Sequence, residues 1–430
     1  MHQALYRKYR PSVFDDVYGQ EHITSILSHE AMNGSVSHAY LFSGSRGTGK
    51  TTVVRALLRI FESADLKTLM LAPTGRAANR MSAAAVCEAK TIHRALEMEK
   101  ADDLFPVYRR DEREPLDADV VIVDEASMID VRLMAALLRP MKRGSRLILI
   151  GDADQLPSVG AGRVLCDLIE SKRFCTVCLT DIFRQSAESL IVTNAHRINR
   201  GEMPILDAKD KDFFYLPVHE DNIPSFLADL ITRRLPKAYG KGIIEDIQVV
   251  TPSRKGRAGT ERLNEILREA ENPSAYGKKE KKIHGTLFRE GDRVMQVRNN
   301  YDLTWKKDNV EGNGVFNGDV GLLQKLADEE GGEVLFDGRV VPYDKDALEE
   351  LDHAYAITIH KSQGSEYPVV IMPLYDCPPM LLTRNLLYTA VTRACRMVIL
   401  VGRKDVIGRM VGNDRHVMRY TLLLAHLSKN

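Results

Sequence analysis

The strongest constraint on the fold is the segment Gly44–Thr51, whose residues GSRGTGKT fit the pattern G-x-x-x-x-G-K-[ST] at every defined position. An apolar run, residues 39–42, precedes it, and apolar residues recur at helical spacing over 53–61. The pattern therefore lies where a strand would end and a helix would begin, which is the context that a phosphate-binding loop requires. A chance glycine-rich turn is a poor alternative because both flanking patterns are present. The segment predicts a P-loop nucleotide site in an α/β domain.

Each residue type in this loop suits a nucleoside triphosphate. Glycines let backbone N–H groups turn toward phosphate oxygens, and the helix N-terminus adds partial positive charge. Lys50 can reach the β- and γ-phosphates, and the Thr51 hydroxyl can ligate Mg²⁺. ATP and Mg²⁺ are therefore the expected cofactors. The predicted nucleotide-binding residues of the loop are Gly44, Ser45, Arg46, Gly47, Thr48, Gly49, Lys50, Thr51 and Thr52.

The composition is that of a soluble protein with more than one domain. At 430 residues the chain is too long for one ordinary core, which indicates two or three domains. No run of about 18 apolar residues is present, and the N-terminus lacks the apolar core of a signal peptide. We therefore expect a cytoplasmic protein without a membrane partner. The net charge of +1 excludes a global basic field, so any binding of nucleic acid needs local patches.

The six cysteines do not indicate a disulfide framework in a chain of this length. Cys175 and Cys178 have the C-x-x-C spacing that occurs in metal and redox sites. Their neighbours, residues 174–179, resemble a β-strand, in which positions three apart face opposite sides. No second C-x-x-C and no histidine pair follows. A pair of strand cysteines is therefore the favoured interpretation.

Short apolar runs alternate with helical patterns in the first part of the chain. The runs are residues 68–72, 120–123 and 147–150. This alternation predicts a parallel sheet that is covered by helices on both faces. In such sheets ligands lie outside the carboxyl ends of the strands, and the polar motifs of this chain fall at those ends.

The same alternation restarts after residue 186, with apolar runs such as 247–251 and 369–372. Residues 285–345 are instead rich in glycine and in short strand-like runs, which suggests a small barrel inserted into a second α/β domain. The predicted organisation is a segment 1–43, a first domain 44–185 with an exposed insert at about 98–117, a second domain 186–284 and 346–430, and a β-barrel insert 285–345.

Asp124 and Glu125 directly follow the apolar run 120–123. In a P-loop site the first carboxylate completes the coordination of Mg²⁺, and the second takes a proton from the attacking water. An Asp-Glu pair is common by itself. It becomes a strong signal here because it follows a strand-like run downstream of Lys50 in the same domain.

Three further polar residues are candidates for the transfer chemistry. Gln155, in the segment 151–157, can bond both a γ-phosphate and the attacking water, although the segment alone would favour a polar turn. Arg184 and Arg393 are candidate cationic fingers, which neutralise charge on the transferring phosphoryl and contribute roughly 10³–10⁵ in rate. The chain has 60 lysines and arginines, so residue type alone does not select these two.

Eight segments of the chain resemble, in order, the motif set of superfamily-1 helicases. They are residues 44–52, 72–78, 91–93, 123–127, 151–157, 183–185, 358–366 and 388–394. The chain most resembles the RecD-like ATP-dependent DNA helicases, a branch that moves 5′→3′ on single-stranded DNA. The resemblance runs from about residue 50 to the C-terminus and includes the non-catalytic stretch 289–302.

The resemblance implies an α/β fold of two RecA-like parallel-sheet P-loop domains, with the small β-barrel inserted in the second. ATP would lie between the two domains, so that binding closes the cleft and hydrolysis reopens it. Lys50 and Thr51 would hold phosphate and Mg²⁺, and Gln155 would sense the γ-phosphate. Asp124 would hold the metal, and Glu125 would activate the water.

The resemblance also assigns Arg184 and Arg393 as fingers from opposite sides, and Gln363 as part of a motif that couples nucleotide state to the grip on DNA. The implied partners are single-stranded DNA and single-strand/duplex junctions, contacted by a monomer with a role in DNA repair or recombination. The barrel would touch the strand, and the loop 109–117 is the candidate wedge for unwinding. The residues implied to line the DNA channel are Thr74, Arg76, His93, His360 and Ser365.

Residues 2–50 resemble another family, the bacterial clamp-loader ATPase subunits of the gamma/tau type, through residues 4–11, 19–22 and 37–44. In clamp loaders this segment helps to hold the adenine, so Gln20 is the candidate adenine contact. Two alternatives follow: a clamp-loader-like switch ATPase, and a truncated or recombined helicase that binds ATP and DNA without productive unwinding. The helicase-type second domain and the lack of a clustered-cysteine zinc module argue against the first.

Overall fold

The computed structural model describes residues 38–85, 87–99, 107–179, 188–208, 211–283, 285–308, 310–327, 331–414 and 421–429. The chain divides into two compact units: unit 1 comprises residues 1–192 and 417–430, and unit 2 comprises residues 193–416. Within the described ranges, no helix is long and apolar enough to cross a membrane.

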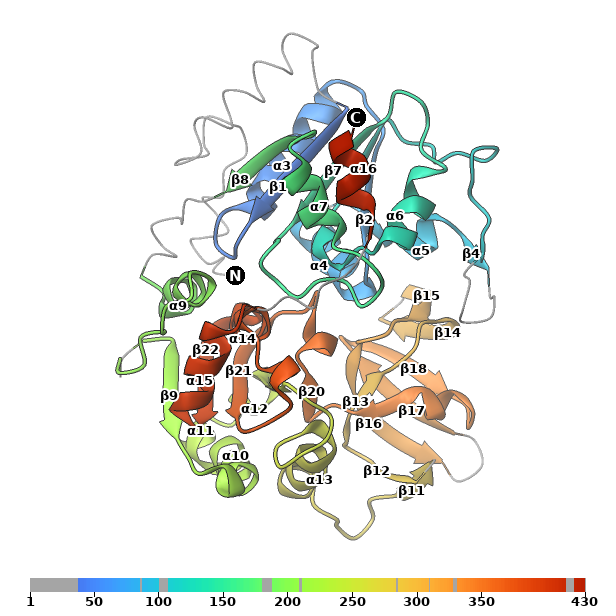
Figure 1. Ribbon diagram of the computed structural model, residues 1–430. Helices are drawn as coiled ribbons and strands as arrows, with labels where there is room; N and C mark the ends of the chain where they lie inside the picture. The colour runs from blue at the N-terminus through green and yellow to red at the C-terminus, as the bar shows by residue number, and fades with distance from the viewer. Residues whose placement is uncertain are drawn as a thin grey trace. The chain divides into compact units, whose positions relative to one another are not determined.

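Unit 1 is built on a sheet whose described strands follow the order β3-β2-β6-β7-β1-β8 (Figure 1). All neighbouring pairs in this order are parallel, which confirms the predicted fold class. Continuous apolar runs form these strands because their side chains are buried on both faces of the sheet. The strands are β1 (Ala39–Gly44), β2 (Thr68–Ala72), β3 (Ala89–Thr91), β6 (Val120–Val123), β7 (Arg146–Gly151) and β8 (Cys175–Leu179).

Helices cover both faces of this sheet. Along β6, Val120 and Ile122 join a core formed with α3, whereas Val121 and Val123 join a second core formed with α6 and α7. The split follows from strand geometry, because successive side chains point to opposite faces. The helices of unit 1 in the described ranges are α3 (Lys50–Ser63), α4 (Gly75–Ala85), α5 (Ile92–Ala95), α6 (Val131–Leu138), α7 (Val164–Ser171) and α16 (Leu423–Lys429), with a 3₁₀ turn at Ala126–Met128.

The two cysteines of the C-x-x-C segment lie on β8, as predicted for a strand. Cys175 packs against the α3 core, whereas Cys178 is exposed. Among the described residues, neither cysteine forms a disulfide bond. In the described part of the chain, no cluster of three or more His, Cys, Asp or Glu residues could hold a metal ion.

The C-terminal helix α16 packs against α7 of unit 1. Leu423 joins the core on that face, and the Thr421 hydroxyl donates to Asp167 Oδ2 at 3.3 Å. The sequence pattern assigns residues 346–430 to the second domain, but these contacts place residues 421–429 with the first. The physical reason is that Leu423 packs, partly buried, against the core that contains α7.

The predicted insert at about 98–117 contains the antiparallel pair β4 (Met98–Glu99) and β5 (Val107–Tyr108). Residues 111–114, which follow it, are exposed. The candidate wedge loop 109–117 therefore has its charged residues at the surface.

Unit 2 contains a second parallel sheet, with the described strands in the order β20-β10-β21-β22-β9 (Figure 1). Its core gathers apolar residues of β10 and β21 with those of α10 and α13. The strands are β9 (Phe213–Pro217), β10 (Ile247–Thr251), β20 (Ala356–Thr358), β21 (Tyr367–Leu374) and β22 (Ala394–Gly402). The helices are α9 (Leu190–Asn199), which contains the unit boundary, α10 (Ile223–Asp229), α11 (Leu235–Tyr239), α12 (Ile243–Asp246), α13 (Thr260–Glu271), α14 (Arg384–Thr392) and α15 (Lys404–Gly412).

Between α13 and β20 the chain forms an antiparallel sheet with its own apolar core, which includes Phe288, Leu323 and Phe336. The described strands follow the order β15-β14-β18-β17-β16-β13-β19, beside a separate pair β11-β12. They extend from residue 280 to residue 353, a wider span than the predicted 285–345. The strands are β11 (Glu280–Ile283), β12 (Thr286–Arg289), β13 (Arg293–Gln296), β14 (Asn300–Lys307), β15 (Val310–Val315), β16 (Val320–Ala327), β17 (Gly331–Phe336), β18 (Arg339–Tyr343) and β19 (Leu351–His353).

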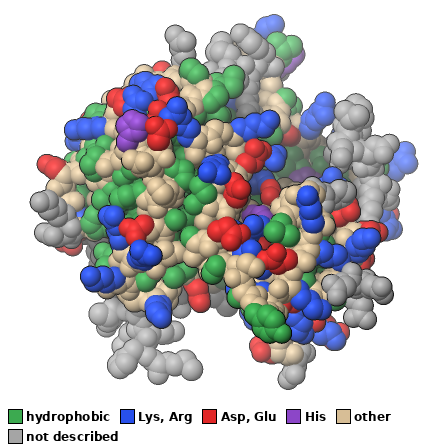
Figure 2. Space-filling model, turned by 90° about the horizontal axis from the view of Figure 1, so that it is seen from below, with side chains coloured by type: hydrophobic (Ala, Val, Ile, Leu, Met, Phe, Trp, Pro, Cys, Tyr) green, Lys and Arg blue, Asp and Glu red, His purple; other side chains and the backbone are tan. Residues whose placement is uncertain are grey.

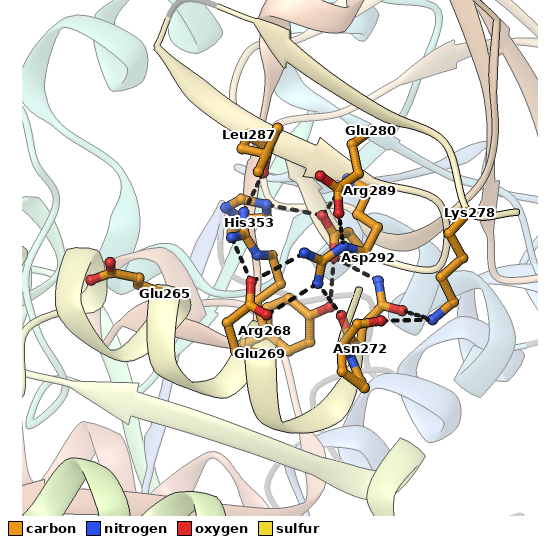
Figure 3. Close-up of polar contacts among 12 residues, drawn as sticks. Glu265, Arg268, Glu269, Asn272, Lys278, Glu280, Leu287, Arg289, Asp292 and His353 are labelled. Atoms are coloured by element: carbon orange, nitrogen blue, oxygen red, sulfur yellow. Dashed lines mark hydrogen bonds and ion pairs between the residues drawn. The ribbon is translucent and has the colours of Figure 1, made fainter. Parts of the chain in front are cut away.

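A buried polar network joins this antiparallel sheet to α13 (Figure 3). Asp292, fully buried, is its centre. The donors to its carboxylate are Asn272 Nδ2 at 2.8 Å, the Tyr355 hydroxyl at 2.9 Å, the Arg289 backbone N–H at 2.7 Å and His353 Nε2 at 3.2 Å. Burial alone would raise the pKa of Asp292, but the hydrogen bonds from His353 and Asn272 hold it below its ordinary value.

Arg289 extends the network, and its side chain is only 3% exposed. Its guanidinium donates to Glu280 Oε1 at 2.6 Å, to Glu269 Oε1 at 3.2 Å and to the carbonyl oxygen of Asn272. A buried charge is tolerated only when it is paired and hydrogen-bonded in this way. The Arg289 side chain thus connects β11 and β12 to the end of α13.

Charges of both signs are interspersed over the face seen in Figure 2, as the small net charge of the chain leads one to expect. Neighbouring charges also pair on the surface of unit 2. Arg403 Nη2 lies 2.7 Å from Asp405 Oδ2, and Arg396 Nη1 lies 3.1 Å from Asp246 Oδ2. Exposed pairs of this kind contribute little to stability.

Candidate functional site

The phosphate loop, residues 45–49, connects β1 to α3. Gly47 and Gly49 have φ angles of 83° and 87°, which only glycine adopts without strain. The Thr48 hydroxyl donates to the carbonyl oxygen of Ser45 at 2.8 Å and braces the turn. Among the described residues, no side chain caps the start of α3. The start of α3 is therefore where we expect an anion to bind, as at other helix N-termini.

Lys50 and Gly44 close this loop. Lys50 Nζ donates to the carbonyl oxygen of Gly44, so the ammonium group lies back across the loop. A Cβ atom at Gly44 would lie 2.6 Å from Thr48 Oγ1 and 2.8 Å from Leu179 Cβ, which excludes a side chain there. Thr51 is exposed at the start of α3. The other predicted loop residues lie beside these: Ser45 is buried, and Arg46 and Thr52 are half-buried.

The strand order brings three predicted motifs to one edge of the sheet. β7 lies between β1 and β6, with Ser43 opposite Gly151 and Val123 opposite Leu149. The carboxyl ends of these three strands are therefore adjacent. A Cβ atom at Gly151 would lie 3.1 Å from the backbone nitrogen of Ser127. The end of β7 is therefore in close contact with the segment that follows β6.

Asp124 and Glu125 lie at the carboxyl end of β6. Glu125 has a φ of 53°, a conformation uncommon outside glycine, and its N–H donates to Asp124 Oδ1 at 2.8 Å. Burial raises the pKa of Asp124 and the Glu125 carboxylate raises it further, whereas Arg80 and Lys50 act in the opposite direction. The loop lysine is thus close enough to Asp124 for their charges to interact.

Thr51 and Asp124 are the predicted metal ligands. A hydroxyl and a carboxylate supply two oxygen ligands, which suits an Mg²⁺ ion whose other ligands are phosphate oxygens and water. The donor set therefore fits the metal that a P-loop site uses.

Arg80, on α4, is part of the site although its sequence gives no motif of its own. Its Nη2 lies 2.7 Å from Glu125 Oε1 and 3.8 Å from Asp124 Oδ2. The available signal was its spacing, one helical turn after Arg76 in the segment that follows β2.

Gln155 follows β7 in a tight turn and is buried. Its Nε2 donates to Asp152 Oδ2 at 3.1 Å, and the other Asp152 oxygen accepts the N–H of Asp154 at 3.1 Å. Asp152, only 1% exposed, thus fixes the orientation of the Gln155 amide. The segment 151–157 thus forms a polar turn, and this turn holds the side chain of the candidate sensor Gln155.

The four predicted residues of unit 2 within the described ranges lie in two neighbouring segments. Arg393, at the C-terminal end of α14, is buried, and its Nη1 donates to the carbonyl oxygen of Ser365 at 3.2 Å. Gln363 is buried two residues before Ser365, and its N–H donates to the carbonyl oxygen of His360 at 3.3 Å. His360 is exposed.

The predicted DNA-contacting residues of unit 1 also share one edge. Ala72 pairs with Thr91 across β2 and β3, so the segments that carry Thr74 and His93 leave the sheet side by side. The Thr74 hydroxyl accepts the N–H of Ala77 at 3.3 Å and begins α4, whose first turn holds the half-buried Arg76.

His93 lies on α5, with its ring centroid 6.3 Å from that of Tyr108 on β5. Burial lowers the pKa of His93, while Asp130 acts in the opposite direction. The sheet edge that carries the predicted DNA contacts is therefore in contact with the hairpin β4-β5. Two further predicted residues, Gln20 and Arg184, lie outside the described residues.

Three family profiles match the chain in order. The profile described as "AAA domain" matches residues 29–214, "ATP-dependent RecD-like DNA helicase SH3 domain" matches 263–336, and "UvrD-like helicase C-terminal domain" matches 353–401. The second match overlaps the antiparallel sheet.

Solved structures of Pif1 helicases share this fold. One, from a study of DNA unwinding at forked double-stranded DNA by two Pif1 helicases, has a TM-score of 0.55 at 18% identity and covers 92% of this chain and 94% of that chain. Bacteroides Pif1 bound to single-stranded DNA has a TM-score of 0.52 at 19% identity and covers 90% and 94%.

Curated relatives are more similar in sequence. The ATP-dependent RecD2 DNA helicase of Deinococcus radiodurans is 36% identical over 356 residues, which is 82% of this chain. The RecBCD enzyme subunit RecD of Mycobacterium tuberculosis is 32% identical over 405 residues, which is 84% of this chain. This chain spans 45% of the length of the first relative and 66% of the second. The motif order, the matched profiles and these identities place the chain in the family of RecD-like helicases.

Proposed function

We propose that this chain is an ATP-dependent DNA helicase or translocase that moves 5′→3′ on single-stranded DNA. The observation that carries the proposal is the gathering of the phosphate loop, the Asp124-Glu125 pair and Gln155 at one edge of a parallel sheet. A site of this composition hydrolyses a nucleoside triphosphate.

The chemistry follows from the positions of these side chains. Lys50 binds the β- and γ-phosphates, and Glu125 accepts a proton from the attacking water. Mg²⁺, held by Thr51 and Asp124, would neutralise charge on the phosphates. Gln155 contacts the γ-phosphate.

Residues of the N-terminal segment and of both domains complete the proposed ATP site. Arg184 and Arg393 neutralise charge on the transferring phosphoryl, Gln363 couples the state of the nucleotide to the grip on DNA, and Gln20 contacts the adenine. ATP binds between the domains, and its hydrolysis lets them separate again.

The proposed DNA contacts lie on both units. Thr74, Arg76 and His93 of unit 1 and His360 and Ser365 of unit 2 grip the strand alternately, so that opening and closing moves the protein along it. The partners are single-stranded DNA and single-strand/duplex junctions, and the chain acts as a cytoplasmic monomer in repair or recombination. One of the Pif1 structures comes from a study of DNA unwinding at forked double-stranded DNA, and the other is bound to single-stranded DNA, which supports this choice.

The test is ATP hydrolysis with and without single-stranded DNA, followed by unwinding of duplexes with a 5′ or a 3′ tail. We expect DNA to stimulate hydrolysis and the 5′-tailed duplex to be unwound. Hydrolysis that does not respond to DNA would reject the motor, and a preference for the 3′ tail would reject the polarity. Stimulated hydrolysis without strand separation would favour a translocase that lacks productive unwinding.

A further inference from the structure

Arg80 holds the carboxylate that is proposed to activate water. The distance of 2.7 Å from its Nη2 to Glu125 Oε1 is that of a charge-assisted hydrogen bond. The Glu125 side chain is 9% exposed and that of Arg80 is 32% exposed, so water screens this pair less than a surface pair. A carboxylate engaged by a guanidinium in this way is held in an orientation toward the cation.

The helix that carries Arg80 also carries a predicted contact to DNA. Arg76 precedes Arg80 by four residues on α4, so the two side chains lie on the same side of the helix, roughly 6 Å apart along its axis. The Thr74 hydroxyl begins the same helix. A DNA strand bound at Thr74 and Arg76 would therefore contact α4, the helix that positions Arg80.

A small shift of α4 would be enough to break the hydrogen bond between Arg80 and Glu125, and the packing of this helix allows such a shift. The first turns of its inner side are formed by Ala77 and Ala78, which pack against Ala72 and Ala89 of the neighbouring strands, and Met81 follows them in the core formed with α3. Small side chains leave the helix close to the sheet, without large interdigitating groups on this part of its surface. A displacement of about 1 Å is enough to break a hydrogen bond of this length, because such bonds weaken steeply beyond about 3.5 Å.

We infer that Arg80 is a positioning residue that restrains Glu125 in the absence of DNA and releases it when single-stranded DNA binds at the start of α4. Arg80 thereby makes ATP hydrolysis depend on DNA. This inference rests on the proposed function, because it assigns a coupling role within the same ATPase.

The experiment compares the parent chain with Arg80→Gln, Arg80→Lys and a control, Arg55→Gln. Arg55, on α3, donates from Nε to the carbonyl oxygen of Ala84 at the other end of α4. The control therefore removes an arginine that contacts the same helix at its C-terminal end. For each protein the kcat and KM for ATP are measured without DNA and with saturating oligothymidylate, and thermal unfolding is recorded.

Arg80→Gln is expected to raise the DNA-free kcat by roughly ten- to a hundredfold, the effect of losing one hydrogen bond to a charged group. Its kcat with DNA is expected to stay within about twofold of the parent, so the stimulation by DNA falls. Arg80→Lys, which keeps a cation at Glu125, is expected to restore most of the stimulation. Arg55→Gln is expected to match the parent in the ratio of the two rates.

Two results would overturn the coupling role. One is an unchanged ratio of the two rates in Arg80→Gln; the other is an equal loss of both rates, which would mean that Arg80 supports Glu125 in every state. If Arg80→Gln does not fold, the ratio measured for Arg80→Lys decides, and an unchanged ratio counts against the role. A parent chain that DNA does not stimulate rejects the proposed function itself, and the coupling with it, before any variant is compared.

Discussion

The ammonium group of Lys50 donates to the carbonyl oxygen of Gly44, six residues earlier in the chain. The lysine side chain therefore already lies over the phosphate loop, between the end of β1 and the start of α3. Because its partner is a backbone oxygen with no charge, an incoming phosphate can replace that partner with a stronger one. The loop is thus preorganised for a phosphate chain.

Lys50→Ala is expected to reduce ATP hydrolysis in the presence of single-stranded DNA to the background rate, because the β- and γ-phosphates lose their cation. Phosphate release measures this, and thermal unfolding confirms that the variant is folded. Lys50→Arg is the matched variant: it keeps the charge but changes the geometry, so we expect partial activity. Retention of more than about a tenth of the parent rate in Lys50→Ala would contradict the assignment.

Glu125→Gln is expected to lower kcat by about 10²–10⁴, the usual contribution of a general base, while ATP still binds. The amide keeps the shape of the side chain and still accepts a hydrogen bond from Arg80. Binding of a fluorescent ATP analogue and single-turnover hydrolysis separate the two effects. Hydrolysis at the parent rate in this variant would exclude Glu125 as the base.

Asp292→Asn is expected to destabilise the folded chain by about 2–4 kcal/mol, because an amide presents a donor where the carboxylate accepts. The pKa of Asp292 is lowered in the fold, so the stability that it contributes is present above its ordinary value of 3.8 and is lost as the pH falls through the lower value. The variant should therefore also lose stability less steeply below pH 4 than the parent. Thermal unfolding across this pH range is the measurement.

The matched control for that substitution is Asp308→Asn. Asp308 is exposed in the turn after β14, with a φ of 52° that asparagine also tolerates. We expect no change in its unfolding temperature. Equal effects of the two substitutions would show that the buried network around Asp292 contributes nothing specific.

Glu271→Gln is expected to stabilise the chain at neutral pH. Burial raises the pKa of Glu271 from 4.5 to about 7, opposed by Arg293, whose Nη1 lies 3.8 Å from Glu271 Oε2. A raised carboxyl pKa means that stability is fully present below 4.5 and is lost as the pH rises through about 7. The loss is of the order of 1–3 kcal/mol, and glutamine removes it.

Thermal unfolding of Glu271→Gln and of the parent at several pH values from 4.5 to 8 tests this sign. The control is Glu265→Gln on the same helix, whose exposed carboxylate pairs with Arg262 at 2.9 Å. Its pH profile should follow that of the parent. A Glu271→Gln profile that also follows the parent would show that Glu271 titrates normally.

The parallel sheets and the phosphate loop could be predicted because their signals are local. A continuous apolar run such as 120–123 specifies a buried strand, and the spacing of Gly44, Lys50 and Thr51 specifies the loop within eight residues. The family resemblance supplied the motif order, and the profile matches and the curated relatives confirm the family. The roles assigned to individual residues stay predictions.

The role of Arg80 could not be predicted because it depends on tertiary geometry. Its partner Glu125 lies 45 residues later, and the contact depends on how α4 packs on the sheet and on the left-handed backbone of Glu125. The position of α16 had the same difficulty. Residues 423–429 form a short helix whose partner, α7, lies far back in the sequence, so no local pattern indicated its unit.

The network around Asp292 connects the two ends of the segment that forms the seven-stranded antiparallel sheet. Asp292 stands where the antiparallel sheet begins, and its partners His353 and Tyr355 stand where the chain returns to the parallel sheet. Asn264 clasps the same return point by accepting the Ala356 N–H at 2.7 Å. Because these contacts fix the two ends of the inserted segment together, extra residues between them add little to the entropy cost of closing the segment. The strands between these residues could therefore be lengthened, shortened or exchanged, while the parallel sheet of unit 2 keeps its own register.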